Sequence, residues 1–253
     1  MFRTAGAEPA PTSSSTLVSA VVQAGARLFD TPEVRRLAGV TRELGVHAVV
    51  GAVERAGATL YCVALYFGPQ GYLGKHRKLM PTAAERTIWG SGDGSTMPVL
   101  HTGRAAFTAA ICWENYMPLF RTALYGKGVD VWCAPTVDDR ESWQATMRHI
   151  ALEGRCFVLS ANQYLLRSAL PADVHPAQGD DPDTVLIGGG STVVSPLGEV
   201  LAGPLRDAEG ILTVELDLGD LARSRFDFDP VGHYARPDVF TLGVDETARG
   251  THP

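Results

Sequence analysis

The sequence predicts an α/β protein in which sheets are layered against helices. The first observation is a set of short apolar runs of strand length, at residues 47–53, 105–111, 129–134 and 156–162. The second is that two segments between or beside these runs, residues 116–127 and 141–155, place apolar residues at helical spacing. Glycines and prolines separate the segments, as expected at the ends of strands and helices.

The N-terminal part of the chain predicts two helices followed by three strands. Residues 1–15 are small and polar, and we expect them to be disordered. Apolar residues in 16–29 fall at helical spacing and predict a first helix, and Pro32 and Gly45 are typical of the start and the end of a second. The strands that follow are expected at residues 47–53, 59–67 and 72–76.

The C-terminal part continues the alternation within a single domain that is expected to span residues 1–253. A long surface loop is expected at 167–183, where Pro, Ala and Asp are frequent and no periodicity is present. Residues 227–253 also lack a period and are expected to form a C-terminal arm. Further elements are expected as strands at 191–195 and 211–216 and a helix at 218–226.

Composition narrows the class of protein. The 253 residues are 45% hydrophobic and carry a net charge of -6, which argues against nucleic acid or an anionic membrane as a partner. No apolar run reaches the length of a membrane span, and residues 1–15 contain no apolar core of a signal peptide. The four cysteines form no CxxC pair and the seven histidines form no HxxxH motif. The sequence therefore predicts a reduced, cytoplasmic protein without a metal site, disulfide or cofactor.

Cys112 is the first candidate for chemistry. It ends the apolar run 105–111 and precedes a predicted helix that Asn115 can cap. A cysteine at such a strand-to-helix turn lies near the positive end of the helix dipole and can be presented to a substrate as a nucleophile. The alternative is a buried structural cysteine, which is the common role of free Cys.

Two separated motifs resemble those of the nitrilase family of carbon–nitrogen hydrolases. They are Gly-Lys-His-Arg-Lys-Leu-Met-Pro-Thr-Ala-Ala-Glu-Arg at 74–86 and Ile-Cys-Trp-Glu-Asn-Tyr-Met-Pro at 111–118, and the resemblance extends from about residue 35 to residue 242. It implies an αββα sandwich, a Glu–Lys–Cys catalytic triad, a small-molecule nitrile as substrate, no cofactor, and a homodimer or larger homo-oligomer.

The resemblance assigns catalytic roles to Cys112, Lys78 and Glu85. Cys112 would be the nucleophile, Lys78 would stabilise the charge that develops on attack, and Glu85 would orient the lysine and the substrate. Without the resemblance, the charge run 75–78 would be interpreted as a solvated face. With it, Lys75 is still expected to be exposed. Glu85 could equally form a surface ion pair with Arg86.

Three further residues are candidates for lining the substrate pocket: Trp113, Glu114 and Thr136. The backbone N–H of Trp113 could serve as an oxyanion-type donor. Glu114 and Asn115 could instead cap the following helix and hold the turn at Cys112. Thr136 follows a strand, where loops often line sites.

One departure from the family concerns the first glutamate of the triad, the general base. Its usual context, an apolar strand ending in Phe-Pro-Glu upstream of the 31–44 helix, is absent, and Glu8 does not match it. The family's opening strand, first helix and second strand are also expected to be missing, so the fold is expected to be N-terminally truncated. Three explanations are open: a start at an internal methionine, which we favour, a truncated product that folds poorly, or an inactive homologue.

The sequence therefore predicts a nitrilase-type hydrolase that converts a nitrile to a carboxylic acid and ammonia. An amidase or carbamoylase of the same superfamily would share the triad and is the nearest alternative. A catalytically inactive homologue that acts only in binding or assembly is the alternative from a different class.

Overall fold

The computed structural model describes residues 16–22, 27–28 and 32–249, and the expected disordered segment 1–15 lies outside them. One sheet has the order β2-β3-β4-β5, and a second has the order β10-β11-β9-β8-β7-β6 with β12 paired to β11. The first sheet comprises β2 (Arg27–Leu28), β3 (Ala48–Ala56), β4 (Thr59–Gly68) and β5 (Gly71–Arg77). The second comprises β6 (Leu100–His101), β7 (Ala106–Ala109), β8 (Val131–Thr136), β9 (Phe157–Asn162), β10 (Tyr164–Leu166), β11 (Val185–Val194) and β12 (Val200–Arg206).

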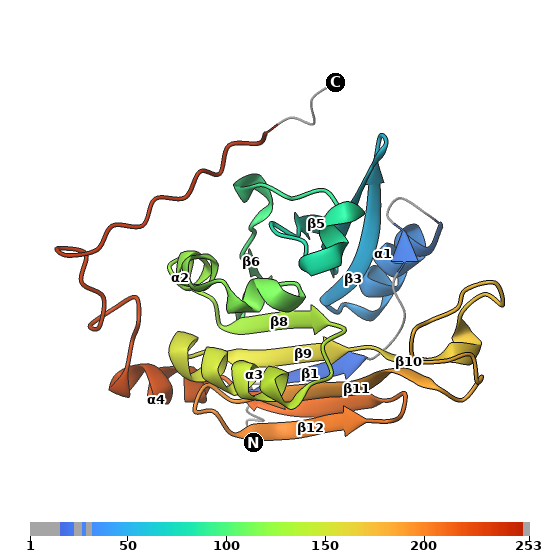
Figure 1. The fold of residues 1–253 in the computed structure, drawn as a ribbon. Coiled ribbons are helices and arrows are strands. Elements are labelled where there is room, and N and C mark those ends of the chain that lie inside the picture. The colour runs from blue at the N-terminus through green and yellow to red at the C-terminus, as the bar shows by residue number, and fades with distance from the viewer. Residues whose placement is uncertain (1–15, 23–26, 29–31, 250–253) are drawn as a thin grey trace, which may run out of the picture.

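Alternation along the strands identifies the two faces of each sheet. In β4, Val63 and Leu65 pack with helix α1 (Pro32–Leu44), whereas Ala64 and Tyr66 point into a core shared with the second sheet. The strand β8 repeats this arrangement, because Trp132 packs beneath the helices α2 (Pro118–Tyr125) and α3 (Glu141–Gly154) and its neighbours face the shared core. The layers therefore run helix, sheet, sheet, helix (Figure 1), which confirms the expected α/β sandwich.

The expected helix at residues 16–29 is wrong. Thr16–Val22 forms strand β1, which pairs antiparallel with β13 (Ile211–Asp217) along its whole length, from Thr16 opposite Asp217 to Val22 opposite Ile211. The segment is rich in valine, which favours a strand, and its partner lies almost two hundred residues away along the chain. A strand is thus present near the N-terminus, where we expected the opening strand to be missing.

Other differences are smaller. The helix expected at 116–127 begins only at Pro118, because Cys112–Tyr116 forms a short 3₁₀ helix, η3. The strand expected at 191–195 begins earlier, as β11 starts at Val185, and β10 and β12 were not predicted. The strand β3 is mostly half-buried.

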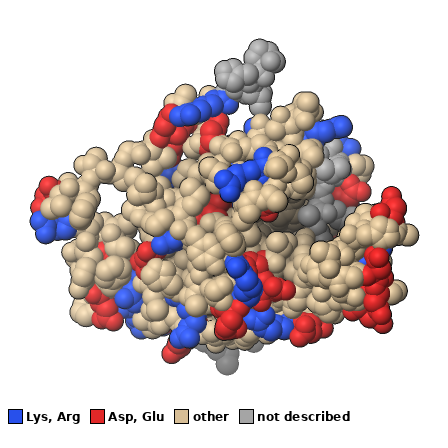
Figure 2. All heavy atoms as spheres, in the orientation of Figure 1, with Lys and Arg blue, Asp and Glu red and all other residues tan. Residues whose placement is uncertain are grey.

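After helix α4 (Gly219–Asp227), the chain runs as an extended arm along one side of the molecule (Figure 1). The arm contacts the body near its end, where Glu246 pairs with Lys127 and the backbone N–H of Arg249 donates to Asp93 at 2.8 Å. On the face of the molecule that Figure 2 shows, basic and acidic side chains are interspersed. Among the described residues, no helix combines the length and the apolar character that crossing a membrane requires.

The helix α3 is fixed to the second sheet by Trp143. This side chain is fully buried, and its indole Nε1 donates a 2.9 Å hydrogen bond to the hydroxyl of Ser160 on β9. We expect Trp143→Phe to lower the free energy of unfolding by about 2 kcal/mol, because it removes a buried donor and leaves space in the core. A urea titration followed by circular dichroism measures the change as a lower midpoint, and an unchanged midpoint would contradict it.

Candidate active site

Cys112 lies at the elbow between β7 and η3, as expected from the sequence. Its backbone φ of 51° is in the left-handed region, which a residue other than glycine adopts only when its surroundings hold it there. Two side chains hold this turn. The amide Nδ2 of Asn115 donates to the carbonyl oxygens of Cys112 at 2.7 Å and Ala110 at 2.9 Å, and the Asn115 Oδ1 accepts from Trp132 at 2.8 Å.

Lys78 follows β5 directly, and its side chain is 1% exposed. A buried ammonium is costly unless it is paired. The partner is Glu85, whose Oε2 lies 2.6 Å from Lys78 Nζ, and the hydroxyl of Thr82 accepts a second bond at 3.1 Å. Glu85 thus pairs with Lys78, whereas Arg86 donates to a carbonyl oxygen of its own turn.

The pair is preorganised by the short helix η1 (Ala83–Thr87), which places Glu85 one turn beyond Thr82. The backbone N–H of Thr82 donates to Glu85 Oε2 at 2.7 Å, and the N–H of Glu85 donates to the carbonyl of Thr82 at 2.8 Å. The bond from the Thr82 N–H to the Glu85 carboxylate is the one that Thr-x-x-Glu predicts at a helix start, while the Thr82 hydroxyl accepts from Lys78. Sequence reasoning did not assign Thr82 to the site, although this spacing could have identified it.

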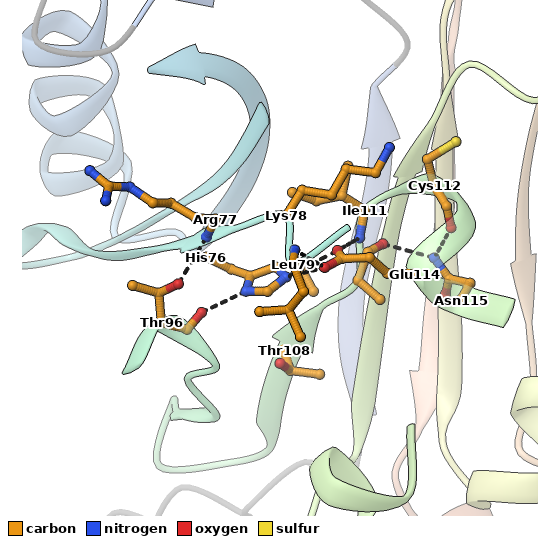
Figure 3. A network of polar contacts seen from close by, with 12 residues as sticks. His76, Arg77, Lys78, Leu79, Thr96, Thr108, Ile111, Cys112, Glu114 and Asn115 are labelled. Carbon is orange, nitrogen blue, oxygen red and sulfur yellow. Dashed lines mark hydrogen bonds and ion pairs between the residues drawn. The ribbon is translucent and has the colours of Figure 1, made fainter. Parts of the chain in front are cut away.

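A buried network joins the segments that carry Lys78 and Cys112 (Figure 3). The carboxylate of Glu114 accepts hydrogen bonds from the ring of His76 and from two backbone N–H groups. Figure 3 also shows that the ammonium of Lys78 and the sulfur of Cys112 point to the same side of this network. Glu114 is 1% exposed, so its carboxylate is enclosed by these donors.

The other two pocket candidates have different surroundings. Trp113 is 40% exposed, and its indole N–H donates to Asp138 at 2.9 Å, while the guanidinium of Arg140 lies 5.0 Å from its ring centroid. The hydroxyl of Thr136 is buried and accepts the backbone N–H of Asp138. The bidentate hydrogen bonds from Arg140 keep the pKa of Asp138 below its usual range, despite the opposing effect of its partial burial.

Cys62, Cys133 and Cys156 lie within the fold, and all four cysteines are free. Burial raises the pKa of each of these three thiols to about 12. Among the described residues, no group of three His, Cys, Asp or Glu side chains is arranged to hold a metal ion.

The reactivity of the four thiols should differ accordingly. The sulfur of Cys112 points to the same side of the polar network as the Lys78 ammonium, whereas burial keeps the other three thiols protonated near neutral pH. At about pH 7 we expect iodoacetamide to modify Cys112 first and to leave Cys133 and Cys156 unmodified in the folded protein. Peptide mass spectrometry after a short exposure measures this order, and equal labelling of all four thiols would contradict it.

The geometry of this site belongs to a fold that is found in known proteins. A carbon–nitrogen hydrolase superfamily protein of Xanthomonas campestris, solved with an arsenic adduct in its active site, matches with a TM-score of 0.69 at 19% identity, over 86% of this chain and 79% of that one. An amidase of the nitrilase superfamily from Nesterenkonia matches with a TM-score of 0.60 at 23% identity, over 77% of this chain and 70% of that one. These similarities establish the fold.

Residues 11–226 match the family model of the carbon–nitrogen hydrolases, and the chain belongs to this family. Within it, the chain is 58% identical over 224 residues to an aliphatic nitrilase of Sinorhizobium fredii, covering 88% of this chain and 73% of that protein. It is 57% identical over 221 residues to a bifunctional nitrilase/nitrile hydratase of Lupinus angustifolius, covering 85% of this chain and 63% of that protein. It is 55% identical over 223 residues to nitrilase 2 of Arabidopsis thaliana, covering 85% of this chain and 65% of that protein.

Proposed function

We propose that this chain hydrolyses a nitrile to a carboxylic acid and ammonia, with Cys112 as the nucleophile. The observation that supports this most directly is the buried ammonium of Lys78, which is paired with Glu85 and points to the same side as the sulfur of a cysteine held at a strained elbow. A nitrile carbon is a weak electrophile, so attack requires a strong nucleophile and a cation near the nitrogen that gains charge.

The proposed reaction has three steps. The sulfur of Cys112 bonds to the nitrile carbon, and the nitrile nitrogen gains a proton to give a thioimidate. Water then adds to that carbon, the carbon–nitrogen bond breaks, and ammonia leaves a thioester on Cys112. A second water cleaves the carbon–sulfur bond, which releases the acid and restores the thiol.

Lys78 is proposed to stabilise the negative charge on nitrogen during attack. Among the described residues, the hydrogen bonds to Glu85 and Thr82 account for two of the three ammonium hydrogens, and the third is proposed to face the substrate. Glu85 is proposed to hold the ammonium in this orientation. Because Glu85 is one-third exposed, it also lies within reach of solvent that enters the site.

We propose that the protein works in the cytoplasm, without a cofactor, as a homodimer or larger homo-oligomer. The assembly would be formed in part by α2, which lies next to the nucleophile. Leu119 of this helix is 70% exposed. Light scattering on the purified chain measures the oligomeric state, and a monomer at every concentration would contradict this part of the proposal.

The test of the proposed function is ammonia release by the purified 253-residue chain from a panel of aliphatic and aryl nitriles. The amide that corresponds to each nitrile is assayed in parallel. Release from nitriles that exceeds release from amides is the expected result. Faster turnover of amides would favour an amidase or carbamoylase instead.

A second candidate function, binding or assembly without catalysis, is supported by one observation. The family resemblance assigns water activation to a glutamate in a Phe-Pro-Glu context, and the sequence contains no such motif. No release of ammonia from any nitrile by the folded chain would favour this second candidate.

A further inference from the structure

Lys78 and Cys112 are held by two different sheets. Lys78 follows β5, which belongs to the four-stranded sheet, and Cys112 follows β7, which belongs to the seven-stranded sheet. No described ladder of hydrogen bonds joins the two sheets, which pack face to face through apolar side chains. Apolar packing is non-directional, so it does not by itself fix the position of an ammonium relative to a sulfur within the tolerance that catalysis requires.

The carboxylate of Glu114 bridges the two segments directly. Its Oε1 accepts the backbone N–H of Leu79, which follows Lys78, at 2.6 Å. Its Oε2 accepts the backbone N–H of Ile111, which precedes Cys112, at 2.9 Å. One side chain is therefore hydrogen-bonded to the immediate neighbours of both proposed catalytic residues.

His76 completes the bridge from the side of β5. Its Nε2 lies 3.0 and 3.1 Å from the two Glu114 oxygens, and its Nδ1 lies 2.6 Å from the carbonyl oxygen of Thr96. Both ring nitrogens thus face acceptors, an arrangement that is satisfied when both carry hydrogen and the ring is cationic. Burial alone would lower the pKa of His76, but the carboxylate of Glu114 raises it overall.

The ring of His76 is also fixed from the helical side. It stacks on Phe120 of α2 with ring centroids 5.5 Å apart, and it is fully buried. A buried charged pair in which every polar atom is satisfied is rigid, and removal of one partner leaves the other charge unpaired. These properties suit side chains that fix the distance between two segments better than side chains that bind substrate.

We infer that His76 and Glu114 are positioning residues: together they form a bridge between the two sheets that sets the Lys78 ammonium relative to the Cys112 sulfur. This inference rests on the proposed roles of Lys78 and Cys112. The bridge touches the neighbours of both residues without taking part in the bond changes.

The first test replaces His76 with phenylalanine, which keeps a ring against Phe120 but removes the donor to Glu114. We expect the rate of Cys112 alkylation by iodoacetamide to fall about tenfold at about pH 7, because the ammonium no longer lies at its fixed distance. With a nitrile substrate, kcat should fall by a similar factor while KM changes by less than about twofold. His76→Gln, whose amide can still donate to Glu114, should recover part of both losses.

The matched control is Tyr66→Phe. The hydroxyl of Tyr66 on β4 accepts the backbone N–H of Ala109 on β7 at 2.9 Å, so it is also a buried contact between the sheets. This hydrogen bond ends at Ala109 and involves neither Lys78 nor Leu79. We expect this variant to have a lower urea midpoint while its Cys112 alkylation rate stays within about twofold of the unmodified chain.

A double-mutant cycle separates positioning from general loosening of the fold. In a Lys78→Met background the bridge has no ammonium to place, so His76→Phe should lower the alkylation rate by less than about twofold further. If the effect of His76→Phe were merely structural, the double variant would lose alkylation rate by the product of the two separate factors. That result would overturn the inference.

Glu114→Asp provides a second variant if His76→Phe does not fold. It keeps the negative charge but is shorter by one methylene, so it cannot reach Leu79 and Ile111 together, and it should slow alkylation in the same way. Wild-type alkylation in folded Glu114→Asp or His76→Phe would refute the bridge. Because alkylation needs no substrate, a chain that hydrolyses no nitrile but shows these rate changes would reject the proposed function and retain the bridge.

Discussion

Replacing Cys112 with alanine should reduce ammonia release from a nitrile by about 10⁴-fold or more. The reason is that the thioimidate and the thioester both form on this sulfur, and no other thiol is placed to substitute for it. Burial raises the pKa values of Cys62, Cys133 and Cys156 to about 12, so these thiols remain protonated near neutral pH. The measurement is initial-rate ammonia release, with each variant checked for folding by circular dichroism.

Serine and glycine at the same position provide the controls. Cys112→Ser keeps a hydroxyl of similar shape but a much weaker nucleophile, so it should be nearly as inactive as the alanine variant. Cys112→Gly removes the side chain at a φ of 51°, where glycine is unstrained, and should therefore be at least as stable to urea as Cys112→Ala. Retained activity in the alanine variant would show that the nucleophile is elsewhere.

Short-range sequence patterns were sufficient to predict the elements whose partners lie nearby in the sequence. The helix ending at Gly45, with its left-handed φ of 64°, and the alternation around the Cys112 elbow follow from short-range rules. The pairing of β1 with β13 does not, because it depends on a partner from the opposite end of the chain. For Thr16–Val22 this distant pairing outweighed an apolar spacing that also fits a helix.

The charge run 75–78 contains the most instructive difference between sequence and structure. Lys75 was expected to be exposed, but its side chain is only 23% exposed and pairs with Glu54, and Arg77 binds the same carboxylate at 2.8 Å. His76 and Lys78 alternate with them and point to the buried side. The period of two in a strand separates these four residues into two pairs, and this rule could have identified His76 from the sequence.

The partner of His76 could not be predicted from the sequence in the same way. Glu114 lies 38 residues from His76, and nothing in either motif indicates that their side chains meet. Only the stacking of two sheets brings β5 and the elbow together. Sequence reasoning therefore found the proposed nucleophile and lysine but not the contacts that hold them at a fixed distance.

Lys78→Met should reduce kcat for nitrile hydrolysis by about 10²- to 10³-fold, the range measured when one preorganised donor to a developing charge is removed. Methionine has a similar length and an apolar stem, so it fills a site that is 99% enclosed, while Glu85 is exposed enough to be solvated once its partner is lost. The main loss should therefore be charge stabilisation in the transition state, with a smaller change in KM.

Two further variants determine whether the position of the charge is as important as its presence. Lys78→Arg keeps the charge but replaces a compact ammonium with a planar fork that does not fit between Glu85 and Thr82, so we expect most of the activity to be lost. Glu85→Gln removes the opposing charge but keeps an acceptor for Lys78, so it should lower kcat less than Lys78→Met does. If Lys78→Met retained the full rate, charge stabilisation by Lys78 would be refuted, and the ammonium would be a structural partner of Glu85 alone.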